Sequence, residues 1–224
     1  MNQGDLFGEG NTEAGSSSPL DINWLYELSC DAYYSILYAR LSELPLEIEI
    51  EQYIEKIRIT AEKFSDKRSS AAREACNTAA KDRGDPYALA ILVTAAKVQS
   101  EVHLLTGLLR FNPDENGVYI ARCAPDYFIL PALADHFTLR FGETPWSIID
   151  ENRNLCLFKE NGREAVISYV KNAAQAVSGD NDDPWEGLWQ LYHRSINNKA
   201  RSNPRLQQQF MPKRYQKYLP EFKG

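Results

Sequence analysis

The spacing of apolar residues changes near Gly107, and this change limits the folds that the chain can adopt. From Asp21 up to this glycine, apolar side chains recur at three- and four-residue intervals, the spacing of helices that bury one face. Beyond it, short apolar segments alternate with turn sequences, which is typical of strands. Helices followed by strands predict an α+β fold. We expect a helical N-terminal half, a small and mainly antiparallel sheet with a crossover helix, and a basic helical C-terminus.

A proline divides the first helical region. Pro45 is expected to break the region from Asp21 to Phe64 into two helices, because proline cannot donate the backbone hydrogen bond that a helix interior requires. The alternating sequence Leu46-Glu-Ile-Glu-Ile would also suit the start of a strand, but Tyr53 and the apolar residues after it return to helical spacing.

Glycine and proline also mark the next helix boundary. An alanine-rich helix is predicted over residues 69–83, with Gly84 at its end. Asp85 then suits an N-cap and Pro86 the first position of another helix. That helix is apolar around most of its circumference, which indicates a central position in the core.

The second half of the chain alternates strands and turns. The loop Asn-Pro-Asp-Glu-Asn-Gly is typical of a hairpin, and Asp126 could cap a helix that crosses one face of the sheet. The predicted strands are 108–111, 118–123, 146–150, 155–159 and 164–169, the crossover helix is 126–141, and the C-terminal helices are 184–196, 204–209 and 212–218.

Polar segments delimit the predicted domain. Residues 8–19 are rich in Gly, Ser and Glu and form an expected flexible linker, so residues 1–19 are interpreted as a disordered tail. We expect one α+β domain over residues 20–224. Its parts are helical (20–106), sheet (107–177) and basic helical (184–224).

Cysteine usage and hydropathy predict a cytoplasmic protein with no membrane partner. No apolar run approaches the roughly 20 residues that span a bilayer, and the polar N-terminus lacks the pattern of a signal peptide. The four cysteines contain no C-x-x-C pair and match no zinc or iron–sulfur spacing, so buried thiols are expected. A disulfide between Cys123 and Cys156 would require neighbouring strands.

Positive charge gathers at the C-terminal end. Residues 189–224 hold eight basic residues and one acidic residue, a net charge of +7, within a chain whose total is −6. Lysine and arginine supply phosphate contacts, and aromatic rings among them can stack on bases, so nucleic acid, and DNA in particular, is the expected partner. The candidate nucleic-acid-binding residues are Arg194, Arg201, Arg205, Lys213, Arg214, Tyr215 and Lys217. The alternative is that this basic end docks onto the acidic body, which carries −13.

A short N-terminal peptide offers a second binding site. Gln3-Gly4-Asp5-Leu6-Phe7 resembles the pentapeptide that binds the bacterial sliding clamp. Leu6 and Phe7 would fill an apolar pocket, Gln3 would supply a directional amide hydrogen bond, and Asp5 matches the acidic position of the pattern. The alternative is an ordinary polar tail with two exposed apolar residues.

Residues 86–222 contain a series of recognisable motifs. These are 101–111 (EVHLLTGLLRF), Pro125-Asp126, His136-Phe137, 145–150 (PWSIID), 201–205 (RSNPR), 210–215 (FMPKRY) and 217–221 (KYLPE). Together they resemble a bacterial family known as probable DNA metabolism proteins, whose domain has no assigned function. Members of that family occur with uracil-DNA-glycosylase-like domains or beside a radical-SAM protein. The resemblance implies a role in DNA repair or processing and those two classes of partner.

Catalytic groups are sparse. Glu101, His103, His136 and Asp150 could supply acid–base chemistry if the fold brought them together. No phosphate-binding loop, dinucleotide motif, nucleophile elbow or metal-binding helix motif occurs, so neither a cofactor nor a metal is expected.

These features predict a DNA-repair or DNA-processing accessory protein, recruited to the replication clamp or to a partner repair enzyme. One alternative is a nuclease or base-processing enzyme that uses the four candidate groups. The other is a protein-interaction module that does not bind DNA.

Overall fold

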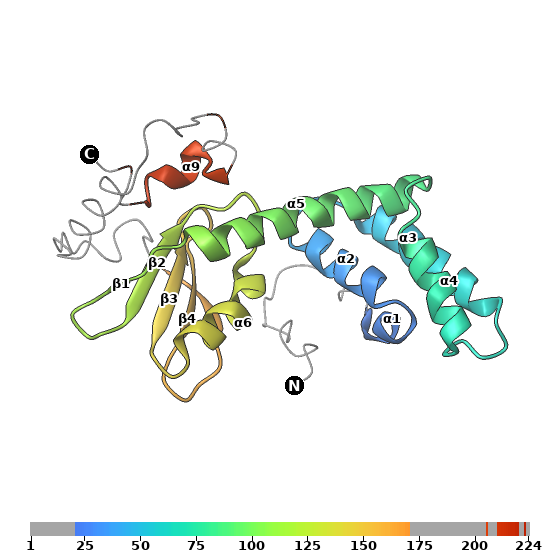
Figure 1. Cartoon of the computed structure of the whole chain (residues 1–224), viewed down its shortest axis with the longest axis horizontal. Coiled ribbons are helices and arrows are strands. Elements are labelled where there is room, and N and C mark those ends of the chain that lie inside the picture. The colour runs from blue at the N-terminus through green and yellow to red at the C-terminus, as the bar shows by residue number, and fades with distance from the viewer. Residues whose placement is uncertain (1–20, 171–204, 206–209, 220–221, 223–224) are drawn as a thin grey trace. The chain divides into compact units, whose positions relative to one another are not determined.

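The computed structural model describes residues 21–170, 205, 210–219 and 222, and it has the predicted α+β architecture (Figure 1). Its contacts divide the chain into two compact units, Met1–Ser100 and Glu101–Gly224. The division falls within the long helix α5 (Pro86–Leu108). The single domain expected over residues 20–224 stays a prediction. Residues 1–20, which include the clamp-like peptide, lie outside the described residues.

The described part of the first unit is helical. Pro45 separates two of its helices, as predicted, but the region before Pro45 forms two helices rather than one, because Ser29 ends the first and caps the second. The alternating segment after Pro45 is helical from Glu47 onward rather than a strand. The helices are α1 (Asn23–Leu28), α2 (Cys30–Arg40), α3 (Glu47–Glu62), α4 (Ser70–Ala80) and the first part of α5.

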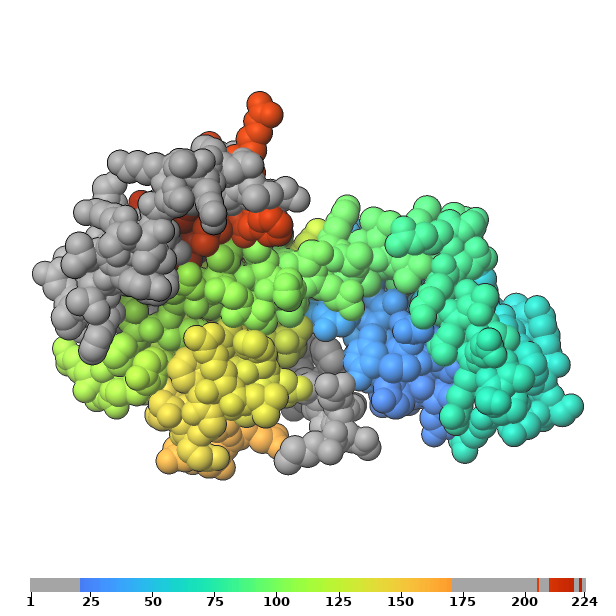
Figure 2. Space-filling model, viewed as in Figure 1, coloured from blue at the N-terminus to red at the C-terminus, as the bar shows by residue number. Residues whose placement is uncertain are grey.

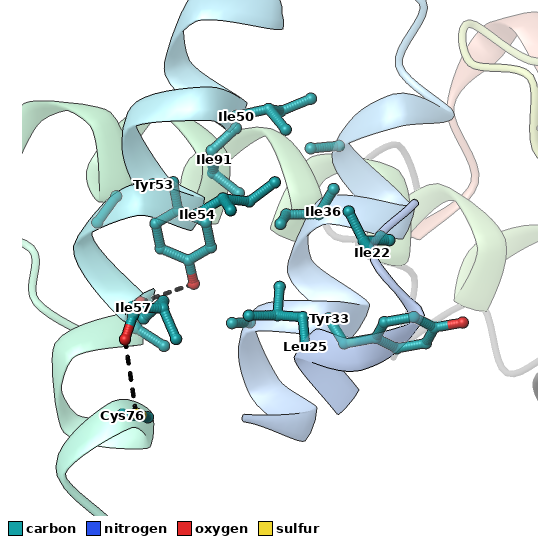
Figure 3. Packing of buried hydrophobic residues seen from close by; sticks show 14 of the residues in the cluster. Ile22, Leu25, Tyr33, Ile36, Ile50, Tyr53, Ile54, Ile57, Cys76 and Ile91 are labelled. Carbon is teal, nitrogen blue, oxygen red and sulfur yellow. Dashed lines mark hydrogen bonds between the residues drawn. The ribbon is translucent and has the colours of Figure 1, made fainter. Parts of the chain in front are cut away.

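The core of this unit lies between these helices (Figure 3). Ile36, Ile57 and Ile91 come from three different helices and are each fully buried. Tyr53 is buried among them, and its hydroxyl donates a hydrogen bond of 3.0 Å to the carbonyl of Ala80 at the end of α4. Burial raises the pKa of Tyr53 to about 12, so this hydroxyl remains a donor across the physiological range.

Side-chain caps fix three helix starts. Ser29 and Ser69 accept hydrogen bonds from backbone N–H groups in the first turns of α2 and α4. Asp85 does the same for α5, with its Oδ1 2.8 Å from the nitrogen of Ala88, and this confirms the predicted cap next to Pro86. The cap is worth about 1 kcal/mol, since it satisfies an N–H that has no partner inside the helix.

Helix α5 is buried along one face only. Ala88, Ile91 and Val98 are fully buried, whereas Leu89 is 38% and Val93 39% exposed. The predicted central position is therefore correct for one side of the helix. Within the part of the chain that the structure describes, α5 is also the one helix whose length and apolar composition would suit a bilayer, a property that core helices share.

The second unit contains a five-stranded sheet with strand order β1-β2-β3-β4-β5. Strands β2 and β3 are parallel and the other neighbouring pairs are antiparallel, as predicted. The strands are β1 (Asn112–Pro113), β2 (Tyr119–Cys123), β3 (Trp146–Asp150), β4 (Leu155–Lys159) and β5 (Val166–Tyr169).

Helix α6 (Leu130–Phe141) provides the crossover that the parallel pair requires. Phe137 of this helix and Trp146 of β3 are both fully buried, with ring centroids 6.1 Å apart. Every residue of β3 is buried, because this strand is central in the sheet and carries the helix on one face. The predicted crossover is therefore confirmed.

Three details of the second unit differ from the prediction. The first strand is Asn112–Pro113 rather than 108–111, because α5 continues to Leu108 and takes those residues into its last turn and exit. The crossover helix begins at Leu130 and has no side-chain cap. Asp126 therefore does not cap it. The hairpin turn was predicted correctly, and Gly117 has the positive φ (79°) that this turn requires.

The cysteines are all free. Cys123 on β2 and Cys156 on β4 lie on opposite sides of β3, so the disulfide that neighbouring strands would have allowed does not form. Cys76 and Cys123 are buried as expected and Cys156 is half-buried, whereas Cys30 is exposed at the start of α2, which corrects the prediction for that residue.

Candidate functional site

Residues 210–219 (FMPKRYQKYL), which we call the docked segment, pack onto the second unit. Tyr215 is 1% exposed and Leu219 is fully buried; Tyr215 lies in the short helix α9 (Lys213–Gln216), which Pro212 precedes, and Leu219 follows that helix. In the space-filling view the red residues of the segment lie on the green surface of the second unit (Figure 2). Burying each of these large side chains contributes about 1.5–3 kcal/mol, so the segment is held by apolar packing as well as by charge.

The Glu101 carboxylate, 4% exposed at the start of the second unit, is the first polar anchor of this segment. Its two oxygens accept hydrogen bonds from the backbone nitrogens of Asp126 (3.0 Å) and Tyr127 (2.9 Å). One oxygen also accepts from Nη2 of Arg214 at 2.9 Å and from the hydroxyl of Tyr215. A buried carboxylate costs little when it is fully paired in this way, so Glu101 has a structural role in this arrangement.

The other arm of the Arg214 guanidinium, Nη1, donates to the Asp126 carboxylate. Arginine presents its terminal N–H groups as a planar fork that matches a carboxylate or a phosphate. Here each side of the fork holds a different carboxylate, one buried and one 52% exposed. Asp126 therefore binds the basic segment instead of capping α6.

Glu151, immediately after β3, is the second polar anchor. Its carboxylate accepts from Nζ of Lys217 at 3.1 Å and from the hydroxyl of Tyr218 at 2.5 Å, and Arg122 of β2 lies 3.4 Å from its other oxygen. Burial alone would raise the pKa of Glu151, but the hydrogen bonds from Tyr218 and Lys217 outweigh it, and the pKa lies below its usual value.

The two anchors have the same composition. At each one, a tyrosine hydroxyl and a neighbouring cation of the docked segment meet a single glutamate of the body: Arg214 and Tyr215 on Glu101, Lys217 and Tyr218 on Glu151. Burial, followed by the hydrogen bond to the glutamate, raises the pKa of each tyrosine well above its usual range, so both hydroxyls remain donors.

Asp150 organises the backbone on which these anchors depend. It is fully buried, and its carboxylate accepts from the backbone nitrogen of Asn152 (2.9 Å) and from Nη1 of Arg153 (3.1 Å). The Arg153 guanidinium then donates to the carbonyls of Pro125 (3.1 Å) and Asp126 (2.9 Å). Through Arg153, Asp150 thus holds the carbonyls of Pro125 and Asp126, next to the two backbone N–H groups that bind Glu101. Burial raises the pKa of Asp150 above its usual value, and Arg153 offsets part of this effect.

The structure brings two of the four predicted catalytic groups, Glu101 and Asp150, to the same backbone segment, and there both are occupied by internal hydrogen bonds. His103 is exposed on α5 and His136 is exposed on α6, where its ring lies 4.8 Å from that of Phe137. In the residues that the structure describes, no hydrogen bond or ion pair joins either histidine to the two carboxylates. The described residues also contain no group of three His, Cys, Asp or Glu side chains arranged to hold a metal ion.

The predicted nucleic-acid-binding residues fall into three groups. Arg194 and Arg201 lie outside the described residues. Arg214, Tyr215 and Lys217 contact carboxylates of the body. For these three residues, the structure agrees with the alternative that the basic end docks onto the acidic body. Arg205 and Lys213 are exposed, and neither forms an ion pair with another described residue.

Sequence reasoning missed Asp126, Glu151, Arg153 and Tyr218 as members of this site. One signal was available: in Arg214-Tyr-Gln-Lys-Tyr218 a cation and a tyrosine recur at a three-residue interval, which places both pairs on one side of a helical turn. The acidic partners carried no such signal, because tertiary contacts alone select them from the many carboxylates of the chain.

The fold and this site define an α+β unit to which a basic C-terminal segment is docked through three carboxylates, of which Glu101 is buried. The model of the domain of unknown function DUF4130 matches residues 69–221, and the chain belongs to this family. No curated protein and no solved structure matches the chain.

Proposed function

We propose that this protein is a DNA-repair or DNA-processing accessory protein that binds the phosphate backbone of nucleic acid through its basic C-terminal region. The observation that carries the proposal is the separation of charge: +7 over residues 189–224 against −13 over the rest of the chain. Like charges concentrated in this way repel one another unless a polyanion or an acidic surface neutralises them.

The carboxylates of the body neutralise only part of the positive charge of the C-terminal region. Arg214 and Lys217 are paired with carboxylates of the body, while Arg205 and Lys213 are exposed and unpaired within the described part of the chain. Lys213 lies two residues before the buried Tyr215 in the same short helix, so a well-packed segment holds its ammonium group in solvent. An exposed cation such as Lys213 on a packed segment suits contact to phosphate, which requires charge and position more than base recognition.

Recruitment completes the proposal. The resemblance of Gln3–Phe7 to the clamp-binding pentapeptide supports attachment to the replication clamp, with Leu6 and Phe7 as the apolar contacts and Gln3 and Asp5 as the polar ones. The resemblance of residues 86–222 to proteins of DNA metabolism supports a partner enzyme, of the uracil-DNA-glycosylase-like or radical-SAM class. In this proposal the protein acts in the bacterial cytoplasm beside that enzyme.

The enzyme alternative has less support. The carboxylates of Glu101 and Asp150 accept hydrogen bonds from backbone N–H groups and from arginines. Among the described residues, no contact joins either histidine to these carboxylates. The hollow along α4, of about 500 Å³, is open to solvent and is lined by residues of that helix and by Lys81 just after it, which include none of the four candidate groups. A catalytic pocket gathers its reactive groups, and these four are not gathered.

The experiment is binding of fluorescent single- and double-stranded DNA across a salt series. The proposal expects affinity that falls steeply with salt, because each phosphate contact releases counterions. The double variant Arg205→Glu with Lys213→Glu should weaken binding to both DNA substrates. The slope of log affinity against log salt concentration should become shallower by the equivalent of about two phosphate contacts. Neither residue supports the fold through a described ion pair, so the variant should unfold at the same temperature as the wild type.

The matched control is Lys67→Glu with Arg163→Glu, which makes the same change of charge at exposed residues outside the docked segment. The proposal expects the control to bind DNA more tightly than the test variant. Equal loss in both would mean that net charge alone governs binding. Absence of binding by the wild type at low salt, together with binding to an acidic protein, would favour the protein-interaction module.

A further inference from the structure

The side chains that hold the docked segment are also cations and aromatic rings of the proposed DNA surface. Both terminal nitrogens of Arg214 are engaged, Nη2 with Glu101 at 2.9 Å and Nη1 with Asp126. A phosphate would approach the same two nitrogens, because its oxygens match the guanidinium fork in the way a carboxylate does. The two carboxylates therefore occupy the positions that phosphate oxygens would take.

Lys217 is placed in the same way. Its ammonium nitrogen lies 3.1 Å from Glu151 and 4.5 Å from the centre of the Tyr218 ring, although 58% of the side chain remains exposed. The carboxylate already neutralises this ammonium, and Tyr218 donates to the same carboxylate oxygen. A phosphate that contacted Lys217 would have to replace Glu151 or share the cation with it.

Tyr215 shows the same conflict for base stacking. Stacking requires an exposed ring face, and Tyr215 is only 1% exposed, with its hydroxyl bonded to Glu101 of the body. In the docked state the segment offers DNA the exposed Lys213, while Arg214, Tyr215 and Lys217 are held by the body.

We propose that the docked segment is autoinhibitory: Glu101, Asp126 and Glu151 act as internal substitutes for phosphate, and nucleic acid must displace these carboxylates from Arg214 and Lys217 to bind fully. This inference rests on the proposed function, since it concerns how the same basic region is regulated. Arg205 and Lys213 make the first contact. Exchange of the carboxylates for phosphates then releases the remaining cations, so the protein binds DNA more weakly than its C-terminal charge would allow.

The test uses the full chain with Asp126→Asn and Glu151→Gln, which keep the size of both side chains and remove their charge. Glu101 is left unchanged, because its burial makes substitution a risk to the fold. Glu101 still holds Nη2 of Arg214, so the variant frees Lys217 and Nη1 of Arg214 for phosphate. DNA binding should tighten by about tenfold near 0.1 M salt, and its salt dependence should steepen by one to two phosphate contacts. Trypsin cleavage after Lys213, Arg214 and Lys217, without DNA, should become faster in the same variant.

The control is Glu115→Gln with Asp135→Asn, an identical change of net charge at two exposed residues of the second unit. Neither has a hydrogen bond or ion pair with the docked segment among the described residues. If the test variant binds DNA more tightly than this control, autoinhibition is supported. This holds even if the wild type shows no DNA binding. Equal affinities in the two variants overturn it and leave the proposed function intact. Absence of binding by all three proteins overturns both.

Discussion

The hydroxyl of Tyr215 donates a hydrogen bond to the carboxylate of Glu101, a residue 114 positions earlier in the chain. The same carboxylate receives Arg214 and two backbone N–H groups, so a single buried side chain connects α5, the segment before α6 and the C-terminal region. These four donors make Glu101 the residue on which the arrangement of the second unit most depends.

Substitution of Glu101 should be far more costly than substitution of Asp126, although both bind the same guanidinium. Glu101→Ala leaves the Tyr215 hydroxyl and two backbone N–H groups without their acceptor at a buried position and removes one of the two carboxylates of Arg214, and we expect a loss of about 3–5 kcal/mol. Asp126→Ala removes an exposed pair and should cost less than about 1 kcal/mol. Urea unfolding of the full chain measures both. Equal losses would contradict the structural role of Glu101.

The two tyrosine anchors should differ in strength. Tyr215→Phe removes a hydrogen bond to a buried carboxylate and keeps the ring, with an expected loss of about 1.5 kcal/mol. Tyr218→Phe should cost less, because Glu151 is 20% exposed and water can replace the lost donor. Tyr215→Ala should cost about 3–5 kcal/mol through the cavity it leaves. Chemical unfolding measures the loss of unfolding free energy in the three variants. A larger loss in Tyr218→Phe than in Tyr215→Phe would show that Tyr218 is the stronger anchor.

Docking through Glu151 should weaken in acid. The folded pKa of Glu151 lies below its usual value of 4.5, so its charged form is favoured by folding. The stabilisation is complete above the unfolded pKa and is lost as the pH falls through the folded pKa. The difference in unfolding free energy between the wild type and Glu151→Gln should therefore be constant near neutrality and should shrink below about pH 4.5. A difference that grows in acid would contradict the ion pair with Lys217.

The cap of α5 should account for a measurable part of the stability of the first unit. Asp85→Ala removes the acceptor for the Ala88 N–H and the 3.4 Å contact with Lys56, and we expect a loss of about 1 kcal/mol. Asp85→Asn retains a good capping side chain and should cost only a fraction of this. Thermal unfolding distinguishes the two, and equal losses would assign the effect to the contact with Lys56.

The thiols should react in two classes. Cys30 is exposed, whereas Cys76 and Cys123 are buried, and burial raises the pKa of all three. A thiol reagent applied to the native protein should modify Cys30 first, and more quickly as the pH rises, because the thiolate is the reactive form. Cys30→Ser should abolish this first phase. Reaction of Cys123 in the native state would show that β2 is more open than the structure has it.

Local sequence signals predicted most of the fold. These signals act within a few residues: Pro45 as a helix break, Asp85 as a cap, Gly117 in the hairpin turn, and the alternating apolar residues of the strands. The structure contains each of these features at the predicted position. The end of α5 was predicted incorrectly, because an apolar run such as residues 108–111 suits a helix as well as a strand.

The site was predicted less well, because its partners are remote in sequence. Asp126 has the chemistry of a cap and stands near a helix start, yet its carboxylate binds Arg214 instead. Glu101 and Asp150 were chosen as titratable groups in motifs, and their burial gives them internal partners. The clamp-like peptide and most of the basic region stay predictions, since residues 1–20 and 171–204 lie outside the described residues.

The long separation between Glu101 and its partners has a consequence for synthesis. Arg214 follows Glu101 by 113 residues, which at about 5–20 residues per second corresponds to roughly 6–23 seconds of translation. The buried core residues of the first unit all precede Glu101 in the chain, so that core can form while the ribosome is still working. The second unit cannot complete its fold until Arg214 and Tyr215 have been synthesised. Until the docked segment leaves the exit tunnel, the nascent chain lacks the Arg214 and Tyr215 donors of Glu101 and leaves the apolar sites of Tyr215 and Leu219 uncovered, so this unit completes its folding only after the docked segment has been made.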